Sequence, residues 1–148
     1  AVSQVCEKNN VTFVAYSPLG RGFMGGAIRD MSVLGEKDIR HTMPRFEGAD
    51  FKTNLEKLDQ LSLLASENDL TVAQLALAWV LAQGDHILTI PGTRFEDRAK
   101  ENLDTASVSV SHGVISRAGE ILSPDTIIGE RWSEIILREV DSEQYRFA

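Results

Sequence analysis

The sequence has little cysteine, little positive charge and no long apolar run. Cys6 is the only cysteine among 148 residues, so no disulfide can form within the chain, and we expect a reducing compartment such as the cytoplasm. We find no signal peptide and no apolar stretch long enough to cross a bilayer. The 15 Lys and Arg against 22 Asp and Glu give a net charge of -7, which argues against general nucleic-acid binding. A nucleotide cofactor is not excluded, because it requires only a local cluster of cations.

The sequence also lacks the residue patterns of the common hydrolytic and metal sites. His41, His86 and His112 are scattered, and no spacing of His, Cys, Asp and Glu matches a metal site. There is no Ser-His-Asp or Cys-His arrangement and no suggestive pair of carboxylates. We expect His41 to be a solvated loop histidine and Trp79 to be a core residue, and we expect Cys6 to be a buried structural thiol.

The hydrophobic pattern indicates helices alternating with two short strands. A hydrophobic content of 43% is enough for the core of one ordinary domain. Apolar runs predict strands at 11–16 and 87–90, and we expect the first to be buried on both faces. Helical spacing and end signals predict helices ending near residue 10 and over 51–67, 72–83, 96–104, 114–122 and 132–140, with Thr71 as an N-cap. We expect no helix to persist in the glycine-rich segment 18–26, and we expect a long irregular loop through Gly48 that is either disordered or functional, for example as a lid.

This order predicts parallel βα units, but two strands cannot complete a sheet. The tail after Ser107 does not have a composition that favours further strands. The chain also opens on Ala1 in the middle of a predicted helix. We therefore expect it to be part of a larger fold.

The second strand runs into a turn with the chemistry of a phosphate site. Ile90-Pro91-Gly92-Thr93-Arg94 follows the apolar strand, and a helix opens there. A helix N-terminus offers unpaired N–H donors and a positive dipole end. Thr93 adds a hydroxyl, and Arg94 and Arg98 lie one turn apart, as bidentate binding of a phosphate monoester requires. The alternative is an exposed ion pair of Arg98 with Asp97 or Glu101.

The first strand ends in a similar way, at Tyr16-Ser17-Pro18-Leu19-Gly20-Arg21-Gly22. Pro18 should hold Ser17 extended, while Gly20 and Gly22 permit positive φ, so that exposed N–H groups cradle a diphosphate. A plain surface turn is the alternative. Tyr16 either stacks on a flat heterocycle or caps the core. The two junctions predict one dinucleotide site if they lie next to each other in space.

Three segments together resemble the aldo-keto reductases. These are Val14 to Gly22, Ala73-Gln74-Leu75-Ala76-Leu77-Ala78-Trp79-Val80-Leu81, and Ile90 to Arg94 with Glu101-Asn102. Pro44-Arg45-Phe46 and Gly129-Glu130-Arg131-Trp132 are similar to the family with less specificity. The resemblance implies that residues 1–148 are the C-terminal portion of a TIM (β/α)8 barrel, with its seventh and eighth βα units and a C-terminal segment.

The resemblance also implies roles for individual residues toward NADPH. Tyr16 would stack on the nicotinamide, and Ser17, Leu19 and Arg21 would hold the diphosphate, with Gly20 and Ile90 beside them. Thr93, Arg94 and Arg98 would bind the adenosine 2′-phosphate, and Glu101 and Asn102 would contact the adenine. Gly92 stands where many members have lysine, which leaves the strength of the NADPH preference open.

The resemblance implies reduction of aldehydes and ketones to alcohols by a parent enzyme. Its general-acid tyrosine, lysine, aspartate and histidine come from the first half of the barrel and have no matching position here. We therefore assign no catalytic residue and expect the chain alone to be inactive. The alternative is a non-catalytic fragment that binds a nucleotide or a protein.

Overall fold

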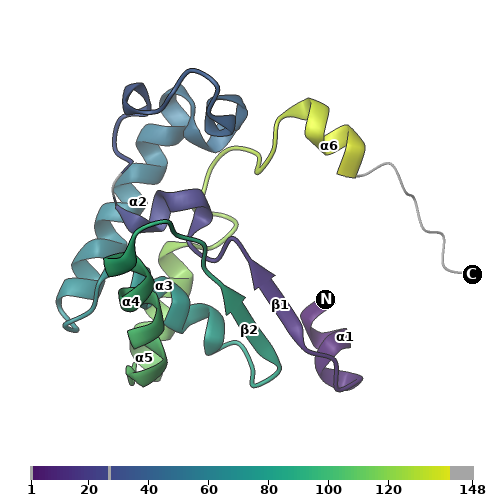
Figure 1. Cartoon of the computed structure of the whole chain (residues 1–148), viewed down its shortest axis with the longest axis vertical. Helices are drawn as coiled ribbons and strands as arrows, with labels where there is room; N and C mark the ends of the chain where they lie inside the picture. The colour runs from purple at the N-terminus through teal and green to yellow at the C-terminus, as the bar shows by residue number, and fades with distance from the viewer. Residues whose placement is uncertain (1, 27, 141–148) are drawn as a thin grey trace, which may run out of the picture.

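The computed structural model describes residues 2–26 and 28–140 and contains helices packed beside a small parallel sheet (Figure 1). The strands are β1 (Phe13–Tyr16) and β2 (Ile87–Ile90). The α-helices are α1 (Val2–Lys8), α2 (Gly48–Ser66), α3 (Val72–Leu81), α4 (Glu96–Asp104), α5 (His112–Ile121) and α6 (Glu134–Val140). Short 3₁₀ helices are η1 (Gly20–Gly25), η2 (Met31–Val33), η3 (Ile39–Thr42), η4 (Pro44–Phe46) and η5 (Thr105–Ser107).

β1 and β2 pair in parallel, as the alternation of helices and strands predicts. Phe13 pairs with Ile87 at one end and Tyr16 with Ile90 at the other. Within the described residues no strand follows β2, in agreement with the composition of the tail. The sheet therefore has two strands, and both carboxyl ends lie at one edge.

The expectation that the first strand is buried on both faces is wrong. Val14 and Tyr16 are exposed, whereas Phe13 and Ala15 are half-buried, and Val11 lies outside the strand. Leu88 and Ile90, the partners of Val14 and Tyr16, are also exposed. Helices cover only the opposite face of the sheet, because no second layer packs on this one within the described chain.

The core consists of two apolar clusters joined by α2. Phe51 and Leu58 of α2 belong to the first cluster, and Leu61 and Ala65 of the same helix belong to the second. The first cluster also contains Phe23, Ile28, Met43 and Phe46, and the second contains Leu75, Ala118 and Ile121. Thus α2 connects the segment after β1 to the helices α3 and α5.

The sequence signals for helix ends are largely confirmed. The Thr71 side chain accepts a bond from the Gln74 N–H at 3.1 Å, and the Gln74 side chain accepts one from the Thr71 N–H at 3.1 Å. This reciprocal capping box satisfies two donors that a helix start leaves unpaired. α3 ends at Leu81 instead of residue 83, and α2 begins at Gly48 instead of residue 51.

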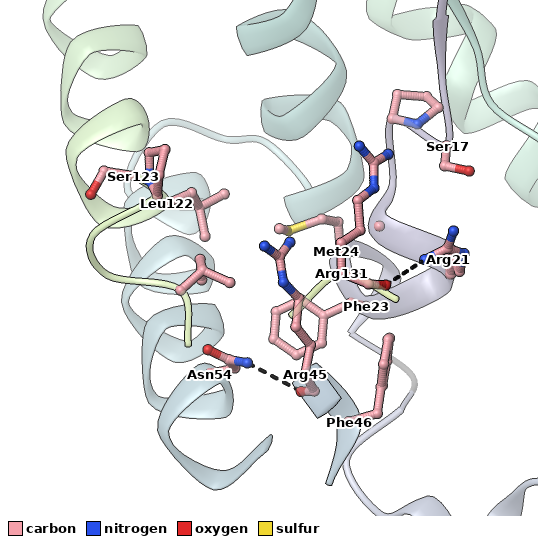
Figure 2. A pocket seen from close by; sticks show the side chains of 14 residues that line it. Ser17, Arg21, Phe23, Met24, Arg45, Phe46, Asn54, Leu122, Ser123 and Arg131 are labelled. Carbon is pink, nitrogen blue, oxygen red and sulfur yellow. Dashed lines mark hydrogen bonds between the residues drawn. The ribbon is translucent and has the colours of Figure 1, made fainter. Parts of the chain in front are cut away.

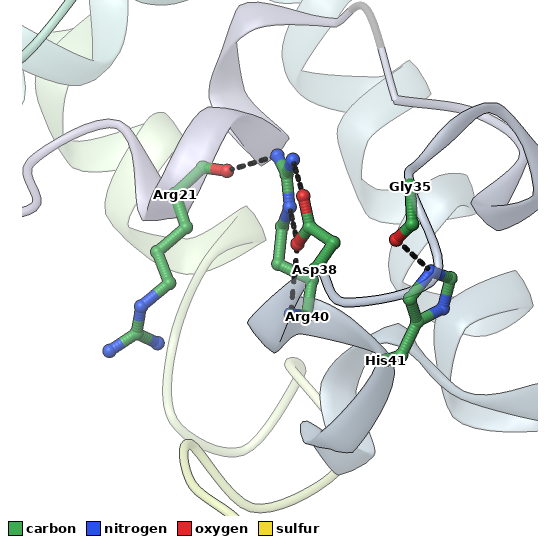
Figure 3. A network of polar contacts seen from close by, with 5 residues as sticks. All are labelled: Arg21, Gly35, Asp38, Arg40 and His41. Carbon is green, nitrogen blue, oxygen red and sulfur yellow. Dashed lines mark hydrogen bonds and ion pairs between the residues drawn. The ribbon is translucent and has the colours of Figure 1, made fainter.

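The segment from Ser17 to Gly48 is more ordered than the expected lid. Four 3₁₀ helices occupy it, and Met43, Phe46 and Ile28 are buried in the first cluster. Asp38 receives bonds from the Arg40 Nη2 and Nε at 2.6 and 2.8 Å, and Arg40 Nη1 donates to the Arg21 carbonyl at 3.0 Å (Figure 3). η1 is not a continuous helix, because Arg21 (φ +57°) and Gly22 (φ +90°) interrupt it with non-helical backbone, as the expectation that no helix persists through this segment requires.

Two single-residue expectations need correction. Cys6 is only half-buried, because α1 buries none of its residues and lies mainly against β1. Trp79 is half-buried at the border of the second cluster instead of inside it. There its indole nitrogen lies so close to Gly119 that a Cβ at that position would be 2.9 Å away.

Among residues 2–26 and 28–140, no helix is both long and apolar enough to cross a membrane. The same residues contain no group of three or more His, Cys, Asp or Glu side chains placed to hold a metal ion.

Candidate functional site

The parallel pairing places the two strand-to-turn junctions at the same edge of the sheet. Tyr16, the last residue of β1, pairs with Ile90, the last residue of β2. Ser17 and Pro91 therefore begin adjacent turns. In α/β folds with parallel strands, ligands bind at this carboxyl edge, because the turns there present backbone groups that the sheet does not use.

The first junction bends more sharply than the sequence predicts. Ser17 has a φ of +50° instead of an extended conformation, despite preceding a proline. The Gly20 N–H donates to the Ser17 carbonyl at 2.9 Å and closes a turn directly after the strand. Gly20 and Gly22 have φ values of +55° and +90°, as expected from their freedom at positive φ.

The second junction leaves the start of α4 without a side-chain cap at its N-cap residue, Phe95. The Thr93 Oγ1 accepts a bond from the Phe95 N–H at 3.2 Å. The guanidinium groups of Arg94 and Arg98 each lie 5.1 Å from the Phe95 ring centroid. Neither arginine forms an ion pair with a carboxylate of the described chain, so the exposed Arg98 pair that the sequence left open is not formed there.

Residues of both junctions line one cavity of about 160 Å³. Leu19, Gly22 and Gly25 come from the first junction, and the start of α3 adds Thr71 to Ala73. The second junction and α4 contribute Gly92, Thr93, Arg98, Glu101 and Asn102. Six of the twelve residues predicted from the sequence therefore meet in one place.

The donor set of this cavity fits a phosphate group. In its lining the Thr93 hydroxyl and the Arg98 guanidinium are hydrogen-bond donors, and the arginine favours negative charge, while Glu101 in the same lining is acidic. At Gly92 a Cβ would meet nothing within 4 Å, so the missing lysine leaves open space beside the cavity.

The other predicted residues lie around this cavity and not in it. Tyr16 and Ile90 are exposed at the strand ends, and Arg94 is exposed beside Phe95. Ser17, Gly20 and Arg21 line a second, larger cavity of about 330 Å³ (Figure 2). The glycine-rich turn after β1 thus contributes to two cavities.

Arginines dominate the polar lining of the larger cavity. Arg21, Arg45 and Arg131 all line it. Burial lowers the pKa of Arg45, and repulsion from Arg131 lowers it further, with Glu130 acting in the opposite direction. Burial is also the main cause of the lowered pKa of Arg21, followed by Arg131. Burial and the neighbouring guanidinium groups thus both make the charged forms of Arg21 and Arg45 less favourable.

Sequence reasoning gave no role to Arg45, Arg131 or Asn54. Arg45 and Arg131 lie within the segments 44–46 and 129–132, which marked the family resemblance without suggesting a function. Asn54 lies on a helix face among apolar residues, and only its burial, at 2% exposure, reveals its importance. No signal in one sequence predicts that residues 74 positions apart, Asn54 and Ile128, are hydrogen-bonded.

His41 is exposed, as predicted for a loop histidine. Its Nε2 lies 3.2 Å from the Gly35 carbonyl oxygen (Figure 3). It lines neither of the two cavities described above.

The parallel βα order and the ligand cavity at the carboxyl edge of the sheet place the protein in the α/β class. The model of the Aldo/keto reductase family matches residues 1–122, and the chain belongs to this family.

Two curated relatives support this assignment. The chain is 39% identical over 131 residues to the aldo-keto reductase yakc [NADP(+)] of Schizosaccharomyces pombe, a match covering 88% of the chain and 38% of that protein. It is 31% identical over 144 residues to the aldo-keto reductase str7 of Strobilurus tenacellus, covering 97% of the chain and 43% of that protein. The chain therefore spans about two fifths of the length of these relatives.

Solved structures give the same fold. The glycerol dehydrogenase AKR11B4 from Gluconobacter oxydans superimposes with a TM-score of 0.73 at 25% identity, over 84% of the chain and 38% of that structure. A thermostable aldo-keto reductase in complex with the inhibitor epalrestat gives a TM-score of 0.50 at 26% identity, over 80% and 32%. The two strands and their helices match part of an aldo-keto reductase TIM barrel.

Proposed function

We propose that this chain carries the cofactor-binding part of an NADPH-dependent aldo-keto reductase whose parent enzyme reduces aldehydes or ketones to alcohols. The observation that carries the proposal is the 160 Å³ cavity, in which Leu19 of one junction meets Thr93 and Arg98 of the other. One relative, the S. pombe protein, has NADP(+) in its name. Bound NADPH would supply the hydride.

We propose for the individual residues the roles that the family resemblance implies. Thr93 and Arg98 would hold the 2′-phosphate, with Arg94 nearby, and Glu101 and Asn102 would contact the adenine. Ser17, Leu19, Gly20 and Arg21 would surround the diphosphate, Gly92 would adjoin the 2′-phosphate, and Ile90 would adjoin Tyr16. Tyr16, which is exposed at the end of β1, would stack its ring on the nicotinamide.

The chain has no residue to which we assign the acid–base step of carbonyl reduction. A general acid and the residues that tune it belong to the first half of the barrel, and no position in residues 1–148 matches them. We therefore propose that the 148-residue chain binds NADPH without turnover. The lone, half-buried Cys6 is compatible with our proposal of a cytoplasmic location.

The cofactor assignment is tested by titrating the chain with NADPH and with NADH, followed by nucleotide fluorescence. Arg98→Ala removes a charge-assisted contact worth about 1.5–3 kcal/mol, so NADPH affinity should fall roughly 10- to 100-fold. NADH lacks the 2′-phosphate and should be affected little. Arg117→Ala is the matched control, because Arg117 is exposed on α5 and pairs with Glu120.

Equal losses for NADH and NADPH would reject the phosphate assignment. Oxidation of NADPH by the purified chain with a panel of aldehydes would reject the proposed lack of turnover. These two outcomes are separate, because the first measures binding and the second measures chemistry.

The second candidate is a non-catalytic binding module. The exposed face of the sheet, formed by Val14, Tyr16, Leu88 and Ile90, favours it, because an apolar surface of this kind binds other protein surfaces. A chain that associates through this face and binds neither NADPH nor NADH would support this function over the first.

A further inference from the structure

The larger cavity combines a charged wall with an apolar wall. Arg21, Arg45 and Arg131 supply the charge. Phe23, Leu122 and Ile127 are among the residues of the apolar wall. At about 330 Å³ the cavity lies in the usual size range of small-molecule sites. A ligand that suits both walls has an apolar body and an anionic head.

A buried asparagine holds the arginine wall in place. Asn54 Nδ2 donates to the Arg45 carbonyl at 3.1 Å and to the Ile128 carbonyl at 2.9 Å, and its Oδ1 accepts from the Ile128 N–H at 2.9 Å. Arg45 Nε donates to the Gly129 carbonyl at 2.8 Å. These bonds join the segment before α2 to the segment before α6, so the backbones that carry Arg45 and Arg131 are fixed against each other.

Gly129 allows this close approach. Its φ is +85°, and a Cβ there would lie 2.9 Å from the Arg45 backbone nitrogen and 2.9 Å from an Asp50 carboxylate oxygen. Only glycine fits the conformation and the space together. The positive φ and the close backbone approach at Gly129 therefore occur where the two arginine-bearing segments meet.

The two arginines keep unused donors directed to the cavity. Arg45 uses its Nε for Gly129, while its terminal nitrogens donate to no group in the described chain. The Arg131 side chain donates to none there either, and its guanidinium lies 4.9 Å from the Tyr16 ring centroid. Figure 2 shows the two side chains running in the same direction from neighbouring segments. No carboxylate of residues 2–26 or 28–140 forms an ion pair with either.

We infer that this cavity binds carbonyl compounds that combine a carboxylate with an apolar body, and that Arg45 and Arg131 bind the carboxylate. The inference deepens the proposed function and rests on it, because Tyr16, which would carry the nicotinamide, is in contact with Arg131. Arg21 adds positive potential, but it donates to the Arg131 carbonyl at 3.5 Å and its guanidinium lies 3.8 Å from the Trp132 ring centroid. The proposed function places Arg21 at the diphosphate, so Arg45 and Arg131 are the two that remain for the carboxylate.

The test uses two aromatic aldehydes that differ only in charge, 4-carboxybenzaldehyde and its neutral methyl ester. Each is titrated into the ¹⁵N-labelled chain, and the Nε–Hε and backbone signals of Arg45 and Arg131 are followed by NMR. The acid should shift these signals and bind at least about tenfold more tightly than the ester, because an arginine–carboxylate contact contributes about 1.5–3 kcal/mol.

Arg131→Gln is the decisive variant, because that side chain makes no hydrogen bond in the described structure and its loss should leave the fold intact. Acid binding should fall about tenfold, with the ester unchanged. Arg45→Gln should act in the same direction, and Arg117→Gln is the matched control. Equal affinity for acid and ester, or shifts confined to other residues, would overturn the inference.

Two further outcomes separate this inference from the proposed function. If NADPH displaces the acid and Arg131→Gln weakens NADPH as much as the acid, the cavity holds the diphosphate and the inference is wrong. If Arg98→Ala leaves NADPH binding unchanged while the acid still binds at Arg45 and Arg131, the carboxylate site stands and the cofactor assignment fails.

Discussion

At the scale of single residues, the polar groups that matter most are the ones that connect distant segments. Asn54 is 2% exposed and makes three hydrogen bonds to the backbone of residues 45 and 128. A buried amide is stable only when its donors and acceptors are paired, and here the partners are backbone groups that would otherwise be unsatisfied. Asn54 thus stabilises a contact that apolar packing alone would not specify.

We predict that Asn54→Leu lowers the free energy of unfolding by roughly 2–4 kcal/mol, because three backbone groups lose their partner in a buried place. Urea denaturation followed by circular dichroism measures the change. Gln60→Leu, at an exposed position of the same helix, is the control and should change stability by less than about 0.5 kcal/mol. Similar values for both variants would show that the Asn54 bonds contribute little.

Asp38 should make the stability of the segment before α2 depend on pH in the acid range. Hydrogen bonds from Arg40 lower the pKa of Asp38 to about 2. The pKa of Asp38 in the folded chain lies below the unfolded value of about 3.9. The contact with Arg40 therefore stabilises the folded state above pH 4, and this stabilisation is lost as the pH falls through 2. The same contact raises the pKa of Arg40.

An NMR titration of the side-chain carboxyl carbons measures this effect directly. In the native chain Asp38 should titrate near pH 2, and Arg40→Gln should return its pKa toward the ordinary value for aspartate. A midpoint for Asp38 near 4 in the native chain would contradict the contact with Arg40.

At the scale of elements, the helices follow local signals and the long connection does not. α4 is predicted to the residue, and the Thr71 cap of α3 is confirmed. The segment from residue 17 to residue 48 has many glycines and charges and predicts an irregular loop, yet it contributes Phe23, Ile28, Met43 and Phe46 to the core. These four apolar residues have no shared period, so only the tertiary structure shows that they face one cluster.

The capping box of α3 can be tested by replacing Thr71. Thr71→Ala removes the acceptor for the Gln74 N–H, and we expect a loss of about 1 kcal/mol in the free energy of unfolding. Thr71→Ser keeps the hydroxyl and is the control. A double-mutant cycle with Gln74→Ala should give coupling between the two residues, whereas strictly additive losses would argue against the reciprocal pair.

At the scale of the whole molecule, the two-stranded sheet has one face that no other described element covers. Val14, Tyr16, Leu88 and Ile90 form an apolar surface on one face, each about half exposed, while helices cover the other face. In a parallel sheet of this class both faces are normally covered. The chain also spans only 38% and 43% of the two relatives' lengths, and its own fold matches part of a barrel.

We predict that the purified chain associates with itself through this face at micromolar concentrations. Leu88→Lys should lower the sedimentation coefficient toward that of a monomer, because a charge at the centre of the apolar surface opposes its burial. Leu63→Lys is the matched control, since Leu63 is equally exposed but lies on α2, away from the sheet. A chain that is monomeric over the whole concentration range would exclude association.

The sequence by itself determined the helices, the two strands, their parallel order and the chemistry of the two turns, because periodicity, caps and glycines act over a few residues. Only the tertiary structure decided which turns meet. It placed Leu19 beside Thr93 in one cavity and Arg45 beside Arg131 in another, since contacts between residues far apart in the chain depend on packing that no local pattern records. It also showed which face of the sheet is exposed, because burial depends on which other elements cover a strand.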